Sequence, residues 1–287
     1  MNKIHVKLFE SLEIGDDHPT IIMGVLNLSP ESFYQGSVYS EPTALENATL
    51  QMIKNGAKIL DLGARSTAPW SQKISIEEEI NRLKSAMELV CRIIPSDIII
   101  SVDTQHSNVA QAAFNISRKF SKKIIINDVS CLKTDPALQD FLIKHEIPVI
   151  LMASKQIPGD LLTIEEIIEE FEKTITKLTS NGYNGDHIIL DPGIGKWIKE
   201  KIHIFDLRII GNLEKLRKLN KPILVAVSRK SFIGTTLDQP DPASRLNGTL
   251  SSTAIAVYNG AHIVRTHDVN NQLLEIVKMA KEIRRNR

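Results

Sequence analysis

The chain has 287 residues, which is enough for one (β/α)8 barrel, because such barrels often fill about 200–250 residues as a single domain. Its 35 lysines and arginines balance 34 aspartates and glutamates, so a net charge of +1 argues against nucleic-acid partners and anionic membranes. Two cysteines without metal-ligand spacing, a polar N-terminus and no long apolar run predict a cytoplasmic protein with free thiols and no membrane span.

The chain begins with a short predicted strand at residues 3–9, and a turn at 15–19 separates it from the rest. From residue 20 on, apolar strand-like runs alternate with amphipathic segments of helical period. Strands are expected at residues 21–26, 58–62, 98–102, 123–126, 148–152, 187–190, 222–227 and 261–264. Helices are expected at residues 43–55, 75–93, 105–120, 135–145, 163–180, 204–219, 244–259 and 270–285. These alternating units predict one α/β domain over residues 1–287, with a β extension at 1–19 and a (β/α)8 TIM barrel at 20–287.

Polar residues follow seven of the eight predicted strands. The loops after the strands build the functional face of a barrel, so this ring predicts a ligand-binding mouth. Its members are Asn27, Ser66, Asp103, Asn127, Asp191, the run SRKS at 228–231, Arg265 and His267. For the SRKS run alone, a helix N-cap with solvated charges is the simpler interpretation.

Asp103, Asn127 and Asp191 would lie at the rim or inside this mouth, where an unpaired carboxylate is costly to bury. A flat heterocycle with an amidine-like edge, such as a pterin or guanine, presents two parallel donors to one carboxylate. The alternative is that the aspartates cap helices or pair with Lys230.

Arg265, His267 and Asn27 would adjoin because the last and first strands meet when a barrel closes. Two potential cations and an amide suit a phosphate or diphosphate, and Asn27 could also meet a metal bound to it. A surface pair between Arg265 and Asp268 with a core histidine is the alternative.

Seven motifs in register resemble the dihydropteroate synthase family of pterin-binding (β/α)8 enzymes, over nearly the whole chain. They are MGVLNLSPESF (23–33), DLGARSTAP (61–69), SVDT (101–104), IND (126–128), LDPG (190–193), SRKSFIG (228–234) and RTHDV (265–269).

The resemblance implies a transferase of folate biosynthesis that condenses 6-hydroxymethyl-7,8-dihydropterin diphosphate with an arylamine and releases diphosphate. The pterin-binding residues would be Asp103, Asn127, Met152, Asp191 and Lys230, with Lys230, Asp103 and Asp191 as the catalytic ones. The diphosphate would bind Asn27, Arg265 and His267, with Mg²⁺ as cofactor on Asn27. The arylamine would bind Ser66, Thr67, Pro69 and Ser231. A homodimer through the outer helices is also implied.

The loops on the arylamine side depart from the family pattern. Arg65 precedes by three residues the position where the family has arginine and this chain has Ala68. Gln35, Ala153 and Lys196 replace an acidic residue, a histidine and an aromatic residue. Three cations on this side, Arg65, Lys155 and Lys196, would suit an arylamine that is more anionic than p-aminobenzoate. One such amine is the phosphorylated ribosyl-aniline of methanopterin-type pathways.

Two other functions would also use a pterin cradle. A methyltransferase acting on a methylated reduced pterin with a corrinoid partner would not need the diphosphate-binding residues. A non-catalytic pterin-binding module would bind the ring without turnover. Arg229 is expected to point outward into a salt bridge, away from the site.

Overall fold

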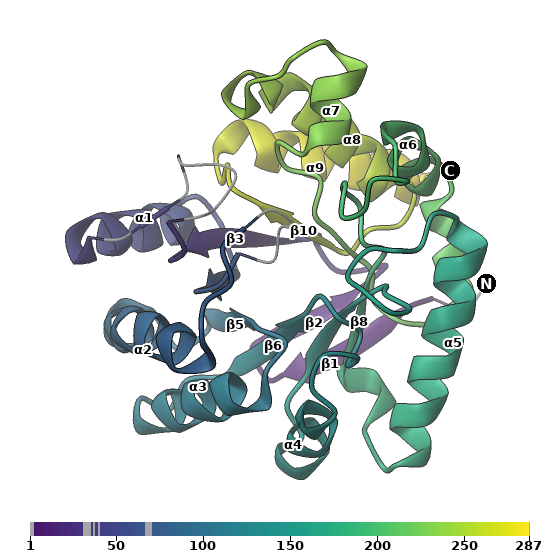
Figure 1. Ribbon diagram of the computed structural model, residues 1–287. Coiled ribbons are helices and arrows are strands. Elements are labelled where there is room, and N and C mark those ends of the chain that lie inside the picture. The colour runs from purple at the N-terminus through teal and green to yellow at the C-terminus, as the bar shows by residue number, and fades with distance from the viewer. Residues whose placement is uncertain (1–2, 31–35, 37, 40, 67–70, 287) are drawn as a thin grey trace.

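Eight parallel strands form the barrel of the computed structural model, which describes residues 3–30, 36, 38–39, 41–66 and 71–286 (Figure 1). In chain order the strands are β3 (Ile21–Asn27), β4 (Ile59–Gly63), β5 (Ile99–Asp103), β6 (Ile124–Asp128), β7 (Val149–Met152), β8 (Ile188–Asp191), β9 (Leu224–Val225) and β10 (Ile263–Thr266). Each pairs with its neighbour in the order β8-β7-β6-β5-β4-β3-β10-β9. A bridge between Leu190 and Ile223 joins the ends of this sheet, so the (β/α)8 barrel is confirmed.

Helices follow the strands and cover the outside of the barrel (Figure 1). They are α1 (Pro42–Lys54), α2 (Ile76–Ile93), α3 (Ser107–Lys119), α4 (Ala137–His145), α5 (Ile164–Ser180), α6 (His203–Gly211), α7 (Ser231–Thr236), α8 (Leu246–Tyr258) and α9 (Asn271–Arg285). The expected capping box is present at α5, where Thr163 and Glu166 satisfy each other's backbone N–H groups. No helix in the described part of the chain is long and apolar enough to cross a membrane.

The sequence-based boundaries fail mainly between residues 204 and 246. The helix expected at 204–219 ends at Gly211, and a 3₁₀ helix, Leu213–Leu219, follows it. The helix expected at 244–259 begins with a 3₁₀ turn, Pro242–Arg245, and the six-residue α7 was not predicted at all. A helix of that length has too few residues to show an apolar period.

The N-terminal extension is a hairpin, not the single strand expected from the sequence. β1 (His5–Phe9) pairs antiparallel with β2 (Leu12–Gly15). Val6 and Leu8 of β1 and Leu12 and Ile14 of β2 are buried. They pack against the first residues of the barrel strands, so the hairpin closes the amino-terminal end of the barrel.

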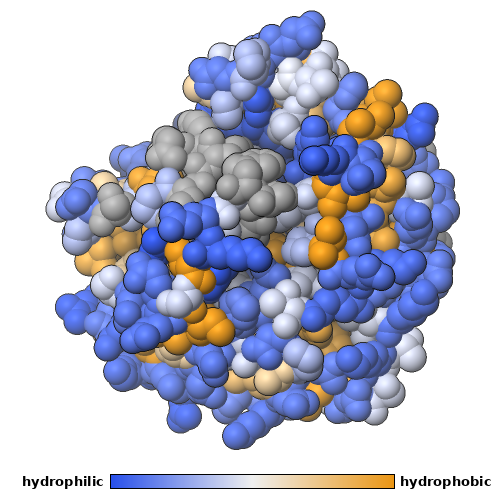
Figure 2. Space-filling view, viewed as in Figure 1, coloured by the Kyte–Doolittle hydropathy of each residue, from blue (hydrophilic) through white to orange (hydrophobic). Residues whose placement is uncertain are grey.

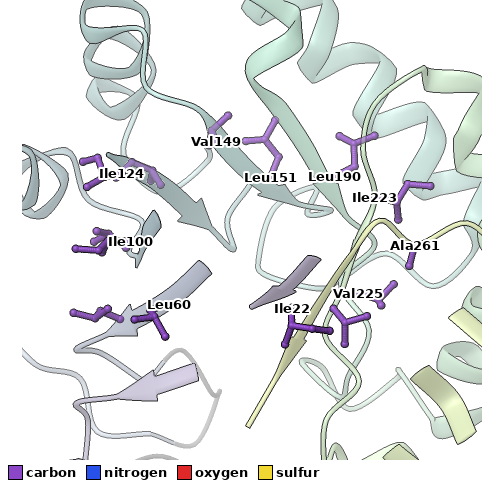
Figure 3. Close-up of a cluster of buried hydrophobic side chains, with 14 of the residues drawn as sticks. Ile22, Leu60, Ile100, Ile124, Val149, Leu151, Leu190, Ile223, Val225 and Ala261 are labelled. Atoms are coloured by element: carbon purple, nitrogen blue, oxygen red, sulfur yellow. The ribbon is translucent and has the colours of Figure 1, made fainter. Parts of the chain in front are cut away.

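The apolar core has two layers, inside and outside the strands. Inside, isoleucines at the starts of the strands meet the hairpin. Outside, a larger cluster fills the space between strands and helices, and Figure 3 shows part of it on neighbouring strands, including Ile22, Leu60, Ile100 and Leu190. Hydrophilic residues predominate on the face in Figure 2, as the amphipathic helices require. The inner apolar layer lies at the amino-terminal end of the barrel, so polar side chains can gather at the carboxyl-terminal end.

Candidate active site

A cavity of about 330 Å³ opens at the carboxyl ends of the barrel strands. The residues predicted to bind the pterin, the diphosphate and the arylamine line it wherever the structure describes them: Asn27, Ser66, Asp103, Asn127, Met152, Asp191, Lys230, Ser231, Arg265 and His267. Thr67 and Pro69, with Gln35 and Ala68 of the altered loops, lie outside the described residues. These residues, which are far apart in the sequence, therefore lie together at the strand ends as predicted, and their roles in binding remain predictions.

Arg265 bridges two carboxylates at the base of the cavity. Its Nε donates to Asp61 Oδ2 at 2.6 Å, and its Nη2 donates to Asp103 Oδ2 at 3.0 Å. The amide of Asn127 also donates to Asp61 Oδ2, at 3.4 Å. The expected alternative of a surface pair between Arg265 and Asp268 is therefore wrong. Asp61 is fully buried inside β4 and was not predicted as a site residue, although a carboxylate in the apolar strand ILDLG was a signal for it.

Each carboxylate has one oxygen bonded to Arg265 and one oxygen without a donor among the described residues. Asp61 Oδ1 and Asp103 Oδ1 are buried, and no described residue donates a hydrogen bond to either. Burial and the neighbouring charge of Asp61 raise the pKa of Asp103 to about 7, against the opposing effect of Arg265. A ligand that brings N–H donors would relieve this unsatisfied arrangement.

Asp191 and Lys230 form the opposite wall of the cavity. Asp191 Oδ1 accepts a hydrogen bond from the Gly193 N–H at 2.8 Å, and burial raises the pKa of this carboxyl. Lys230 Nζ donates to the Ile194 carbonyl at 2.5 Å, and burial lowers the pKa of the amine to about 8. Neither Asp103 nor Asp191 therefore caps a helix, which was the alternative considered from the sequence.

The loop after β8 is held by residues that sequence reasoning missed. Lys201 Nζ, which is fully buried, donates to the Gly193 carbonyl at 2.6 Å. Asp206 accepts from the Gly195 N–H at 2.8 Å. Gly195 has a φ of +128°, and a Cβ there would lie 3.2 Å from Cδ of Lys230, so only glycine fits easily. This loop also carries Trp197, whose ring centroid is 6.0 Å from Lys230 Nζ.

His267 is half-buried beside Arg265, and its surroundings disfavour the charged form of the imidazole in the protein without ligand. Burial and the cations Arg265, Lys230 and Arg229 lower the pKa of His267 to about 3. Its Nδ1 lies 3.0 Å from the hydroxyl oxygen of Ser228. A bound anion would favour the protonated form, because an opposite charge raises the pKa of a histidine.

Arg229 forms the expected salt bridge and does not line the cavity, but it is buried and does not point outward as expected. It forms a two-point ion pair with Asp268, with both N–O distances at 2.8 Å. It also donates to the carbonyls of Pro242 and Ala243. Arg245, another residue that the sequence did not reveal, lines the cavity and donates to the Arg229 carbonyl at 3.0 Å. The two arginines fix the backbone that carries Lys230.

The cations expected on the arylamine side separate into two groups. Arg65 and Lys196 line the cavity, whereas Lys155 is exposed and does not line it. Arg65 is fixed by buried Glu79, with Nε to Oε2 at 2.5 Å, and Glu79 also accepts from Thr104 at 2.7 Å. The cavity therefore has a carboxylate-lined base and cations farther along its wall.

Sequence and structure comparisons agree on the relatives of this chain. The pattern described as pterin binding enzyme matches residues 23–267. The dihydropteroate synthases of Synechocystis sp. and Bacillus subtilis are 35% and 33% identical to it, over 91% of this chain and 89% and 87% of theirs. The solved dihydropteroate synthase of Coxiella burnetii in complex with pteroic acid superimposes with a TM-score of 0.84 at 30% identity, covering 99% of this chain and 100% of that one. The dihydropteroate synthase of Xanthomonas albilineans with 4-aminobenzoic acid gives a TM-score of 0.82 at 26% identity, with 98% of each chain covered.

These relatives favour the condensing transferase over the pterin-dependent methyltransferase, and they match the chain along almost all its length. The resemblance stated from seven motifs is thereby confirmed. The chain belongs to the pterin binding enzyme family and, within it, to the dihydropteroate synthases.

Proposed function

We propose that the protein joins 6-hydroxymethyl-7,8-dihydropterin diphosphate to p-aminobenzoate. The C–O bond to diphosphate breaks, the amine nitrogen bonds to the same carbon and loses a proton, and diphosphate leaves. The observation that carries this proposal is the Asp103 carboxylate, which lines the cavity and keeps a buried oxygen that no described residue satisfies. A pterin ring edge supplies the N–H donors that this oxygen lacks.

The pterin ring would lie at the base of the cavity. Asp103 and Asp191 would accept hydrogen bonds from its donors, and the Asn127 amide would complete the polar edge. Met152 would pack on the ring as an adaptable apolar side chain. Lys230 would lie between the ring and the arylamine, where its amine also balances the charge of Asp191.

The diphosphate would lie toward Arg265, His267 and Asn27. Arg265 uses Nε and Nη2 for the two aspartates, and among the described residues no acceptor occupies its Nη1. That N–H group can hold a phosphate oxygen whose charge grows as the C–O bond breaks. Positioning and charge stabilisation suffice for this reaction, and no side chain need form a covalent bond.

Mg²⁺ would bind at this site together with the diphosphate. Among the described residues, the one group of three potential metal ligands is His5, Glu13 and His18, and none of them lines the cavity. Mg²⁺ usually keeps several waters and binds one or two protein oxygens plus substrate phosphates, so the side-chain oxygen of Asn27 is a suitable ligand. When bound, it would neutralise charge on the leaving diphosphate.

The arylamine would enter along the outer wall, beside Ser66, Thr67, Pro69 and Ser231. A phosphorylated ribosyl-aniline is a second candidate, because Arg65 and Lys196 line the cavity on this side. Two cations beyond the carboxylate-lined base would suit a second anionic group.

The test is diphosphate release by the purified protein with the pterin diphosphate and each amine in turn. Release with p-aminobenzoate supports the main proposal, and a strong preference for the phosphorylated amine supports the second. Pterin binding without release from either mixture would contradict both and favour a non-catalytic module. Methyl transfer from a methylated reduced pterin would instead favour the methyltransferase.

A cytoplasmic location, a homodimer and the absence of nucleic-acid partners stay predictions of the sequence and the family resemblance. Light scattering of the purified protein over a concentration series would test the dimer. A mass equal to one chain throughout the series would contradict it.

A further inference from the structure

The outer face of the N-terminal hairpin carries two histidines and a glutamate whose ligand atoms converge. His5 Nε2 lies 3.1 Å from Glu13 Oε2, and His18 Nε2 lies 3.5 Å from the same oxygen. The three ligand atoms lie within 4.8 Å of one another. None of these residues lines the active-site cavity.

The hairpin register explains why these side chains meet. His5 pairs with Gly15 and Lys7 with Glu13, so His5 and Glu13 lie on one diagonal of the same face. Val6, Leu8, Leu12 and Ile14 occupy the other face and plug the barrel, which leaves the histidine face toward solvent. The geometry of the ladder alone thus joins two of the three ligands.

The third ligand is brought back by a fixed turn. Asp16 accepts a hydrogen bond from the Ile4 N–H at 2.8 Å and forms a two-point ion pair with Arg217, at 2.8 and 2.9 Å. These contacts hold the chain that leads to His18, and the His18 ring stacks on that of His5 with centroids 4.9 Å apart. The contacts thus bring the three ligands near one another, and the nearly parallel rings must turn on binding so that both Nε2 lone pairs point at one ion.

We propose that His5, Glu13 and His18 form a site for a borderline divalent metal ion, with Zn²⁺ as the best match. Zinc takes imidazole nitrogen and carboxylate oxygen at about 2.0–2.1 Å, so the ligand atoms of a tetrahedral site lie about 3.3 Å apart. The two separations from Glu13 Oε2, 3.1 and 3.5 Å, bracket that value, and the two imidazole nitrogens lie within 4.8 Å of each other. Imidazole ligands disfavour Mg²⁺ and Ca²⁺, and water would complete the four-coordinate shell.

Such an ion would fasten both strands of the hairpin to the segment that enters the barrel. The side chains of His5, Glu13 and His18 are 56%, 38% and 32% exposed, so an ion can reach them from solvent. Bound metal would therefore raise the unfolding temperature, because it binds the folded chain in preference to the unfolded one. The inference does not depend on the proposed reaction.

The test uses the full chain without an affinity tag, freed of metal with a chelator. We expect calorimetry to show one Zn²⁺ per chain, and Co²⁺ to give the visible absorption of a tetrahedral site. His5→Ala, Glu13→Gln and His18→Ala should each weaken Zn²⁺ binding by at least about 100-fold, because even groups behind the ligands contribute 10- to 100-fold. His203→Ala, at a histidine of α6 outside the cluster, should bind as the parent does.

Three results would overturn the proposal. One is the absence of Zn²⁺ binding by the parent chain. A second is unchanged binding in all three variants, and a third is binding that is lost in His267→Ala and kept in His5→Ala, which would locate the ion in the barrel mouth. Circular dichroism and the metal-free unfolding temperature show whether each variant is folded, and the near-isosteric Glu13→Gln keeps the test valid if a histidine variant is not.

Discussion

Replacing Asp61 by asparagine tests the buried network on which the candidate site is built. Asp61 accepts from Arg265 Nε at 2.6 Å and from the Asn127 amide at 3.4 Å, while its other oxygen has no partner among the described residues. Asparagine keeps the shape and one acceptor oxygen but removes the charge. Arg265 then keeps its ion pair with Asp103.

The expected destabilisation is about 2 kcal/mol, since a hydrogen bond to a charged group contributes about 1.5–3 kcal/mol and asparagine retains a neutral acceptor. For a chain larger than about 150 residues this lowers the unfolding temperature by about 4–8 °C. Arg265→Met should cost more, about 3–5 kcal/mol, because it leaves two buried carboxylates unpaired. Asp97→Asn breaks an exposed pair with Lys58 and should cost about 1 kcal/mol or less.

The cost of Asp61→Asn should also depend on pH. The folded-state pKa of Asp103 is raised to about 7, partly by the charge of Asp61, so the parent loses stability as pH rises from about 4 toward 7. Without Asp61 the pKa of Asp103 falls and that loss shrinks. Urea unfolding should therefore show a larger cost of Asp61→Asn at pH 5 than at pH 8.

Urea denaturation of these variants at pH 5 and pH 8 measures both the cost of each substitution and its dependence on pH. The reasoning is refuted if Asp61→Asn is as harmless as Asp97→Asn, or if its cost is greater at pH 8 than at pH 5. A cost for Arg265→Met below that of Asp61→Asn would likewise mean that the two carboxylates are not held by this guanidinium.

The remaining predictions concern the lysine proposed as catalytic, the buried glutamate that holds Arg65, and a buried histidine. Lys230→Ala should reduce diphosphate release by at least about 100-fold while the barrel stays folded by circular dichroism, and unchanged turnover would remove the lysine from the mechanism. Glu79→Gln should loosen Arg65, which it holds at 2.5 Å, and raise KM for the arylamine several-fold with little change in that for the pterin. Burial lowers the pKa of His262 to about 4, so the folded state should lose about 3 kcal/mol as pH falls from 6.5 to 4. His262→Asn should flatten that part of the urea stability profile, and an unaltered profile would contradict the assignment.

The barrel was predictable because its signal is repeated and local. Each buried strand is a continuous apolar run, and each helix carries its own period and stop signals, as at α2 and α5. The errors fall where elements are too short to show a period: α7 has six residues and β2 has four. The second strand of the hairpin also depends on packing against the amino-terminal ends of the barrel strands. These contacts are distant in sequence, so a short stretch of sequence cannot reveal them.

The site was predictable to the extent that it lies at strand ends. Asp103 and Asp191 could be placed at one mouth by topology alone. Asp61 could not, because it lies within a strand and only its burial marks it. Glu79 supports Arg65 from the next helix, and no spacing rule connects the two. The lowered pKa of His267 follows from burial and surrounding cations, which exist only in the folded chain.

The charge arrangement of the mouth also explains how one cavity can accept two unlike halves of a substrate. At its base Arg265 pairs with Asp61 and Asp103, and each of these carboxylates keeps a buried oxygen that has no donor among the described residues. Such a base costs stability in the empty protein and favours a ring edge rich in N–H groups. A diphosphate needs cationic donors instead. Arg265 can bind it because the two aspartates fix the guanidinium in place and leave Nη1 without a protein acceptor in the described part of the chain. The same ion pairs that satisfy the buried carboxylates thus hold the anion-binding group in position before substrate arrives.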